Sequence, residues 1–260
     1  MQKLYVKKIG TGRVNLILIH GWGYNSNIWF KINQILNKNF LIHLVDLPGY
    51  GNNNNIQSAN IYDTIDILYY NLPTNAIWVG WSIGGLIISK LAIIYPNCIA
   101  GIINITSSPC FIKKPQWPGI TIKKLNDLYQ NMQKNYFNSI NNFLKLQIKD
   151  NLYLKKYEKK TLNKIIYKHF PPSYITIKNN MKIIQETDIR EDINKIKIPI
   201  MYIFGDIDPI IPNNIKNILI TKFNKKSFII KNCGHMPFLS HYHILCKYIL
   251  FFKKNIFLFK

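Results

Sequence analysis

Residues 76–85, AIWVGWSIGG, join a short apolar run to a serine that stands between glycines. The run Ala76–Gly80 has the length and apolarity of a buried strand, and Ile83–Tyr95, apolar nearly all round, has those of a buried helix. The motif G-x-S-x-G therefore lies at a sharp strand-to-helix turn, where side chains two positions either side of Ser82 would collide with the turn. Ser82 is therefore either a reactive nucleophile or part of an inert tight turn, and features elsewhere in the chain distinguish the two interpretations.

Five other short apolar runs share the character of Ala76–Gly80. Each is bounded by polar or turn residues, and its continuous apolarity is typical of a parallel strand that is covered on both faces. These runs are Val14–Ile19, Phe40–Val45, Gly101–Ile105, Ile200–Phe204 and Ser227–Ile230. Helical segments such as Trp29–Leu36 lie between them, so the alternation predicts a doubly wound, mostly parallel α/β sheet.

The alternation stops between Phe111 and Thr187. This segment is rich in lysine, asparagine, tyrosine and leucine, and residues 125–148 and 154–170 have the pattern of amphipathic helices. Pro171 and Pro172 then favour a turn. We expect residues 1–110 and 188–260 to form the core, and residues 111–187 to form a helical lid inserted in it.

The formal charge of +22 is carried almost entirely by lysine. Only two of the 34 basic residues, Arg13 and Arg190, are arginine, and asparagine, isoleucine, tyrosine and phenylalanine are also abundant, as drift toward A/T-rich codons would produce. The lysines are spread along the chain, and no zinc-finger, helix-turn-helix or RNA-binding signature accompanies them. We predict no nucleic-acid partner, whereas an acidic protein partner remains open.

The sequence gives no sign of export, membrane insertion or metal binding. Residues 1–10 lack an apolar run and a cleavage site, and no uninterrupted apolar stretch reaches about 18 residues. The four scattered cysteines have no paired metal spacing. We expect a cytoplasmic monomer with reduced thiols and no metal or cofactor. Residues 248–260, YILFFKKNIFLFK, predict an amphipathic final helix packed on the core, with a role at a membrane surface as the alternative.

A serine hydroxyl is a poor nucleophile without a base in hydrogen-bonding reach. Of the six histidines, His235 is best placed, because it lies in a glycine-marked loop just after the last apolar run. Ligand-facing residues of an open α/β sheet lie in such loops. The stretch FGDIDP, residues 204–209, follows another strand and offers two carboxylates to orient the imidazole. We favour Asp208 over Asp206, which could instead cap the turn.

A tetrahedral intermediate needs hydrogen-bond donors for its oxyanion. The backbone N–H of Ile83, directly after Ser82, is one candidate. The other is the N–H of Trp22 in HGWG, residues 20–23, which follows an early apolar run and whose glycines allow a close approach to substrate. A plain glycine turn is the alternative for HGWG. No group of histidines and carboxylates has the spacing of metal ligands.

The motifs resemble the α/β-hydrolase superfamily across nearly the whole chain. HGWG, DLPGYG at residues 46–51, GWSIGG and the loops of Asp208 and His235 come in the order of that superfamily, as does the series Ser82, Asp208, His235. Longer stretches resemble one family within it more closely, the esterases that act on the methyl ester of pimeloyl-[acyl-carrier protein] in biotin synthesis. These stretches are residues 43–49, 77–86, 107–111 and 117–120.

The resemblance implies a reaction and a partner. Ser82 would attack the methyl ester of a pimeloyl chain carried on acyl-carrier protein, methanol would leave, and water activated by His235 would release the acid. The residues that would bind substrate are Trp22, Ser82, Ile83, Phe143, Leu144, Lys145, Leu146, Gln147 and His235. Lys155 and Lys159 stand where the family has basic residues, so the resemblance implies that they contact the acidic carrier protein.

The chain departs from the family pattern in the predicted lid. Asn138 and Asn142 stand where the resemblance leads us to expect arginines, although Lys145 and Lys149 could compensate electrostatically. Alternative functions stay open, among them a carboxylesterase for free short-chain esters and a non-catalytic module that binds a ligand or the carrier protein. Ser82 argues against the aspartate-nucleophile hydrolases, whereas C–C bond hydrolysis uses the same motif and stays open.

Overall fold

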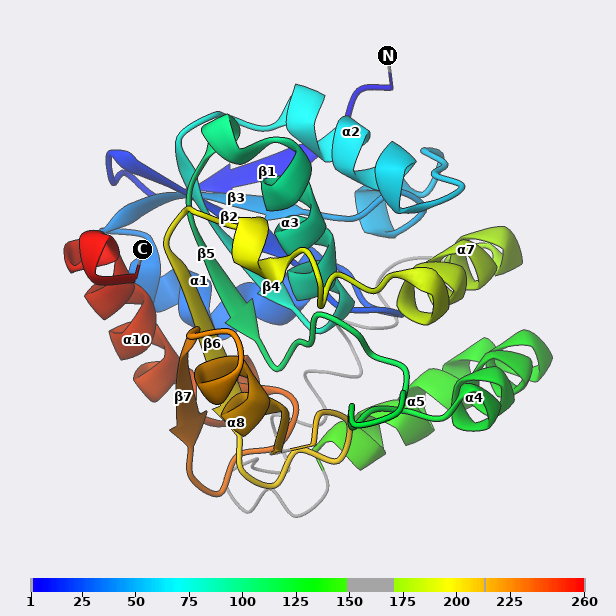
Figure 1. The fold of residues 1–260 in the computed structure, drawn as a ribbon. Helices are drawn as coiled ribbons and strands as arrows, with labels where there is room; N and C mark the ends of the chain where they lie inside the picture. Colours follow the sequence, from blue (N-terminus) through cyan, green and yellow to red (C-terminus); the bar gives the residue numbers. More distant parts are fainter. Residues whose placement is uncertain (1, 149–170, 213, 260) are drawn as a thin grey trace.

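The computed structural model describes residues 2–148, 171–212 and 214–259 (Figure 1). Within these residues seven strands form one sheet in the order β1-β3-β2-β4-β5-β6-β7. β1 (Val6–Ile9) pairs antiparallel with β3 (Phe40–Val45), and the other neighbouring pairs are parallel. The predicted fold class, a doubly wound and mostly parallel α/β sheet, is confirmed.

Each of the six predicted apolar runs forms a strand. The remaining strands are β2 (Val14–Ile19), β4 (Ala76–Trp81), β5 (Ile99–Ile105), β6 (Ile200–Gly205) and β7 (Lys226–Ile230). The sequence prediction missed β1, because Lys7 and Lys8 interrupt its apolar residues and are exposed. Such a pattern is possible at the edge of a sheet, where a strand is paired on one side only.

Helices cover both faces of the sheet. α1 (Phe30–Leu36) packs against α10 (Tyr242–Lys254) on one face, while α2 (Ile61–Asn71) packs against α3 (Ile83–Ile94) on the other (Figure 1). The other helices outside the segment between β5 and β6 are α8 (Asn214–Thr221), α9 (Pro237–Ser240) and the 3₁₀ turns Ser26–Trp29, Gly51–Asn53, Pro96–Cys98, Ile193–Lys195 and Ile256–Phe259. None of the helices in the described part of the chain is both long and apolar enough to cross a bilayer.

Three further helices lie between β5 and β6 in the chain. α4 (Ile122–Lys134) contacts both α5 (Tyr136–Gln147) and α7 (Tyr174–Glu186), and Figure 1 shows the three lying together to one side of the sheet. The sequence led us to expect one helix over residues 125–148. The chain instead turns at Asn135, whose Oδ1 accepts the N–H of Asn138 at 3.0 Å and caps α5.

The helix predicted over residues 154–170 lies outside the described residues and stays a prediction. The structure differs from the sequence prediction at the end of this segment. α7, which we did not predict, follows Pro171 and Pro172 and begins after Ser173, whose hydroxyl accepts the N–H of Thr176 at 3.2 Å. The sequence carried this N-cap signal, a serine placed just before a run with helical periodicity.

Candidate active site

Ser82 lies between β4 and α3 in a backbone conformation that L-residues rarely adopt. Its φ and ψ are 55° and −122°, and its N–H donates to the carbonyl of Ile105 at 3.0 Å. A Cβ at Gly80 would lie 2.5 Å from the backbone of Gly84, and one at Gly84 would lie 2.7 Å from the carbonyl oxygen of His20. Both glycines are therefore required by the turn, and strain of this kind collects at functional sites. The geometry is that of a nucleophile elbow.

His235 forms a buried pair with Asp208. Nδ1 of the imidazole lies 2.8 Å from Oδ2 of the carboxylate, and neither side chain exposes any surface. The other carboxylate oxygen accepts the N–H groups of Ile210 at 2.7 Å and Ile211 at 3.0 Å, which fixes the orientation of the carboxylate. Nε2 of His235 is buried and has no hydrogen-bond partner among the described residues. The imidazole is thus oriented, with its second nitrogen free to accept a proton.

Asp206, the alternative carboxylate, contacts a different group. Its Oδ1 accepts the N–H of Cys233 at 3.1 Å, so it braces the loop that carries His235. Cys233 itself is buried, which raises the pKa of its thiol to about 12 and keeps it protonated at neutral pH.

The main chain of His235 is held from three directions. Its carbonyl oxygen accepts hydrogen bonds from Nε1 of Trp81 and Oγ1 of Thr106, both at 2.9 Å. Its N–H donates to the carbonyl oxygen of Gln147 at 3.3 Å. Because Trp81 directly precedes Ser82, this bond brings the serine and the histidine to the same end of the sheet. The sequence analysis included Trp81 only within residues 77–86, and it predicted neither its bond to His235 nor that of Thr106.

The HGWG loop lies beside the elbow and offers a free donor. The N–H groups of Trp22 and Ile83 donate no hydrogen bond to any residue that the structure describes, which is compatible with their predicted role as oxyanion donors. Gly21 lies against the ring of Trp81, where a Cβ would come within 2.7 Å of a ring carbon. Gly23 has φ of 80°, which favours glycine.

His20 joins the HGWG loop to the loop after β3. Its Nε2 accepts the N–H of Leu47 at 2.9 Å, and its Nδ1 lies 2.8 Å from the carbonyl oxygen of Gly21. Since Nε2 accepts, Nδ1 carries the proton and donates it. Burial lowers the pKa of His20, against the opposing effects of Asp46 and of the bond to Gly21, so the ring is neutral at neutral pH. His20 is therefore a structural connection between two loops of the site.

A pocket of about 910 Å³ opens at Ser82 beneath the helices that follow β5. Its apolar side chains include Trp22, Phe111, Ile120, Leu125, Leu128, Phe143, Leu146, Ile184 and Ile210. Polar side chains on α4, on α5 and at the residue between them also line the pocket: Lys124, Asp127, Asn131, Lys134, Asn135, Asn138, Ser139, Asn142 and Gln147. The pocket is lined by both apolar and polar side chains, which suits an acyl chain attached to a polar group.

The structure separates the residues that sequence analysis proposed for substrate binding. Trp22, Ser82, Phe143, Leu146 and Gln147 line the pocket, whereas Ile83, Leu144, Lys145 and His235 do not. Leu144 is 2% exposed and packs into the core, and Lys145 is exposed to solvent. Positions 143, 146 and 147 share one face of α5, and 144 and 145 do not, because successive helical residues are rotated by about 100°. Of the five α5 residues predicted to contact the acyl chain, Leu144 and Lys145 thus do not line this pocket, and their contact with substrate stays a prediction.

The carrier-protein contacts proposed from the sequence fall mostly outside the described residues. Lys149, Lys155 and Lys159 belong to that part of the chain, whereas Asn138 and Asn142 line the pocket. Among the described residues, no three His, Cys, Asp or Glu side chains are grouped so that they could hold a metal ion.

Residues 14–242 match the family model described as the alpha/beta hydrolase fold. The chain belongs to the α/β-hydrolase family. Bromoperoxidase from Bacillus anthracis has a TM-score of 0.86 at 19% identity and covers 97% of this chain and 95% of its own. An esterase from Exiguobacterium antarcticum has a TM-score of 0.83 at 19% identity and covers 97% and 96%. At this level of identity these solved structures show the fold alone.

Several curated relatives of this α/β-hydrolase are named pimeloyl-[acyl-carrier protein] methyl ester esterase. The one from Wigglesworthia glossinidia brevipalpis is 39% identical over 98% of this chain and 99% of its own length. Relatives with the same name from Hamiltonella defensa and Yersinia pseudotuberculosis are 33% and 31% identical, over 99% and 98% of the chain and 99% of each relative. The resemblance inferred from the motifs is confirmed.

Proposed function

We propose that this α/β-hydrolase is a serine carboxylesterase that hydrolyses the methyl ester of pimeloyl-[acyl-carrier protein], releasing methanol and the pimeloyl-carrier protein for biotin synthesis. The observation that carries the chemistry is the elbow of Ser82 at one end of the sheet beside the buried pair of Asp208 and His235. Full-length similarity to esterases of that name supports the choice of substrate. The mixed apolar and polar lining of the pocket suits a carrier-bound acyl chain.

The proposed chemistry uses each group in the position described above. Nε2 of His235 takes the proton of the Ser82 hydroxyl as Oγ attacks the ester carbonyl, and the N–H groups of Trp22 and Ile83 stabilise the oxyanion. The imidazolium then protonates the leaving methanol. Water deprotonated by His235 attacks the acyl-enzyme and returns Ser82 to its free state. Asp208 holds the tautomer of His235 that has its proton on Nδ1, and stabilises the imidazolium.

We propose residues 111–187 as the lid of this site, in a protein that acts as a monomer in the cytoplasm. α4, α5 and α7 contribute most of the pocket wall that is not part of the core. The formal charge of +22 would speed encounter with an acidic carrier protein, because long-range attraction raises association rates. All four cysteines are free and buried, which suits a reducing compartment.

The test compares wild-type and Ser82→Ala protein on three compounds. These are pimeloyl-[acyl-carrier protein] methyl ester, dimethyl pimelate and p-nitrophenyl acetate. Wild-type protein should hydrolyse the carrier-bound ester with a higher kcat/KM than either free ester, and Ser82→Ala should hydrolyse none. A preference for the free short-chain ester would assign the protein to general carboxylesterases. Absence of turnover on all three, together with failure of a fluorophosphonate to label Ser82, would leave a binding module instead.

A further inference from the structure

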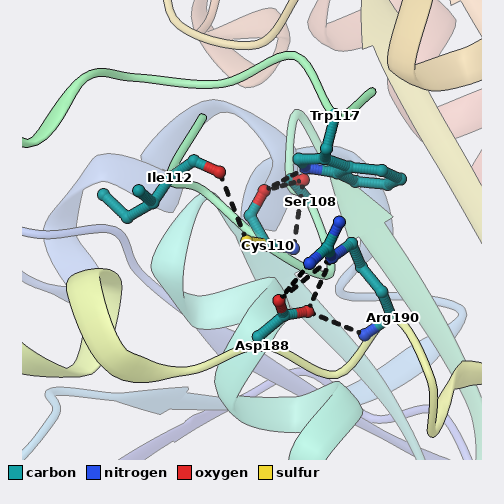
Figure 2. A network of polar contacts seen from close by, with 6 residues as sticks. All are labelled: Ser108, Cys110, Ile112, Trp117, Asp188 and Arg190. Atoms are coloured by element: carbon teal, nitrogen blue, oxygen red, sulfur yellow. Dashed lines mark hydrogen bonds and ion pairs between the residues drawn. The ribbon is translucent and has the colours of Figure 1, made fainter. Parts of the chain in front are cut away.

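The chain leaves and re-enters the core through two segments that are paired to each other. Cys110, shortly after β5, forms an antiparallel bridge with Asp188, shortly after α7. Next to the bridge, the N–H of Ile189 donates to the carbonyl oxygen of Pro109 at 2.9 Å. Figure 2 shows the side chains gathered there from both segments. The pairing forms the base of the proposed lid.

A single arginine connects the two segments through its side chain. The guanidinium of Arg190 grips the carboxylate of Asp188, with Nε 2.9 and 3.0 Å from its two oxygens and Nη2 2.6 Å from Oδ2 (Figure 2). The same guanidinium lies 5.4 Å from the ring centre of Trp117, a distance typical of cation–π contacts. Nε1 of Trp117 in turn donates to the carbonyl oxygen of Cys110 at 2.8 Å. We call Cys110, Trp117, Asp188 and Arg190 the clasp.

Lysine cannot make this set of contacts. A guanidinium is planar, offers several donors in a fixed fork and stacks on aromatic rings, whereas an ammonium acts as a point charge. The chain contains 32 lysines and two arginines. At position 190 the donors of the guanidinium bind the carboxylate of Asp188, and its planar face lies over Trp117. Arg13, the other one, is exposed in the turn before β2. Arg190 therefore stands out from the lysine-rich composition for a geometric reason.

The clasp borders the wall of the pocket. Phe111, Gly119, Ile120 and Ile184 all line the pocket, and they lie within eight residues of a clasp residue along the chain. Backbone hydrogen bonds tie this wall together, from Ile120 to Phe111 at 2.8 Å and from Lys113 to Ile120 at 2.9 Å. A shift of the two segments against each other would move the wall relative to the elbow.

The pair of Arg190 and Asp188 is unlike a purely stabilising core contact. The two side chains are 28% and 32% exposed, so their ion pair is partly screened by solvent and should add little to global stability. Burial by itself would raise the pKa of Asp188, but its hydrogen bonds to Arg190 and the charge of that residue keep the pKa below the ordinary value. The carboxylate stays ionised at neutral pH and the grip persists.

We propose that Arg190 is a positioning residue for the pocket, which it keeps in shape for a medium-length acyl chain by clamping Asp188 to the segment of Trp117. Arg190 touches no substrate and acts through the wall formed by Phe111, Ile120 and Ile184. The inference rests on the proposed function only in taking this pocket as the acyl site. It concerns selection by chain length and leaves the attack by Ser82 unchanged.

The test uses Arg190→Lys, with Arg13→Lys as the matched control, on p-nitrophenyl acetate and p-nitrophenyl heptanoate. Arg190→Lys should raise KM for the heptanoate roughly fivefold or more, because only binding of the longer acyl chain is weakened. The value of kcat/KM for the acetate and the rate of Ser82 labelling by a fluorophosphonate should stay within about twofold of wild type. Arg13→Lys should match wild type on both esters. Equal losses on the two esters, or a lower Tm with no change in KM, would overturn the proposal.

A second pair of variants tests the clamp through the two partners of Arg190. Asp188→Asn and Trp117→Leu each remove one side of the grip, and each should reproduce the selective rise in KM for the heptanoate. Combining Asp188→Asn with Arg190→Lys should add little beyond either change, because both break one interaction. Full additivity would contradict the clamp. Wild-type protein that hydrolyses both esters but ignores the carrier-bound methyl ester would reject the proposed substrate while leaving this test valid.

Discussion

The carbonyl oxygen of Gln147 accepts a hydrogen bond of 3.3 Å from the backbone N–H of His235. Gln147 is the last residue of α5, so a helix of the proposed lid touches the main chain of the proposed base directly. The side chain of the same residue accepts the hydroxyl of Tyr24 at 2.9 Å, and Tyr24 directly follows the HGWG loop. One buried glutamine thus joins the lid to the histidine loop and to the loop that supplies an oxyanion donor.

Tyr24→Phe should lower kcat more than it raises KM. The change removes the hydroxyl and leaves the buried side chain of Gln147 without that donor. The HGWG loop then loses the hydrogen bond that connects it to α5 and, through Gln147, to the loop of His235. We expect kcat to fall about tenfold on short and long esters alike, which corresponds to about 1.4 kcal/mol in activation free energy. Tyr129→Phe is the matched control, because its hydroxyl accepts a bond from Gln133 at 2.9 Å on an exposed part of α4. An effect of equal size in the control would refute the coupling.

The two carboxylates after β6 should differ sharply under substitution. Asp208→Asn removes the charge 2.8 Å from Nδ1 of His235 and favours the wrong tautomer, so kcat should fall by on the order of 10⁴. Asp206→Asn weakens the bond to the N–H of Cys233 but leaves the pair of Asp208 and His235 in place, so it should cost less than about tenfold. Steady-state rates on p-nitrophenyl acetate distinguish the two variants. Greater damage from Asp206→Asn would reverse our assignment of the orienting acid.

The sheet could be predicted from sequence because burial on both faces leaves a continuous apolar run, as in Val14–Ile19 and Phe40–Val45. The elbow could be predicted because a Cβ at either of its glycines would collide with nearby backbone atoms, so the turn leaves a local sequence pattern. The edge strand β1 escaped prediction since an edge tolerates exposed lysines. The break at Asn135 was missed because α4 and α5 carry one uninterrupted helical pattern, and only the cap by Asn135 separates them.

Contacts between distant segments could not be predicted in the same way. Nothing local marks Trp81 as a donor to residue 235, or Gln147 as an acceptor from that residue, because each bond depends on how loops from separate strands meet. The clasp of Arg190 shows the same limit. Its sequence signal is only the scarcity of arginine, and the partner that uses the guanidinium appears once the fold brings Trp117 beside it.

Trp81→Phe should misplace the imidazole without removing it. The carbonyl oxygen of His235 accepts from both Trp81 and Thr106, so loss of one donor is partly compensated by the other. We expect Trp81→Phe and Thr106→Val each to lower kcat several-fold, and the double variant to lose more than the sum of the two free energies. A double-mutant cycle on kcat measures this coupling. Simple additivity would show that the two donors act independently of each other.

Protonation of His20 should contribute to acid destabilisation of the fold. Burial depresses its pKa in the folded protein, while the unfolded chain takes up the proton near the ordinary value of about 6.5. Stability from this group is therefore complete above about pH 6.5, and it is lost as the pH falls from there toward the lower pKa of the folded state. Protonated Nε2 could no longer accept the N–H of Leu47. The HGWG loop would then lose its hydrogen bond to the loop after β3.

His20→Gln tests this origin of the pH dependence, because the amide oxygen can replace Nε2 as acceptor without titrating. Below pH 6.5 the free energy of unfolding of the wild type, measured with urea, should fall more steeply than that of the variant, by up to about 1.4 kcal/mol per pH unit for one proton. His243→Gln, at an exposed position, serves as the control and should keep the wild-type slope. Parallel curves for wild type and His20→Gln would show that other groups cause the loss of stability in acid. If His20 were the cause, its replacement would make the slope below about pH 6.5 less steep.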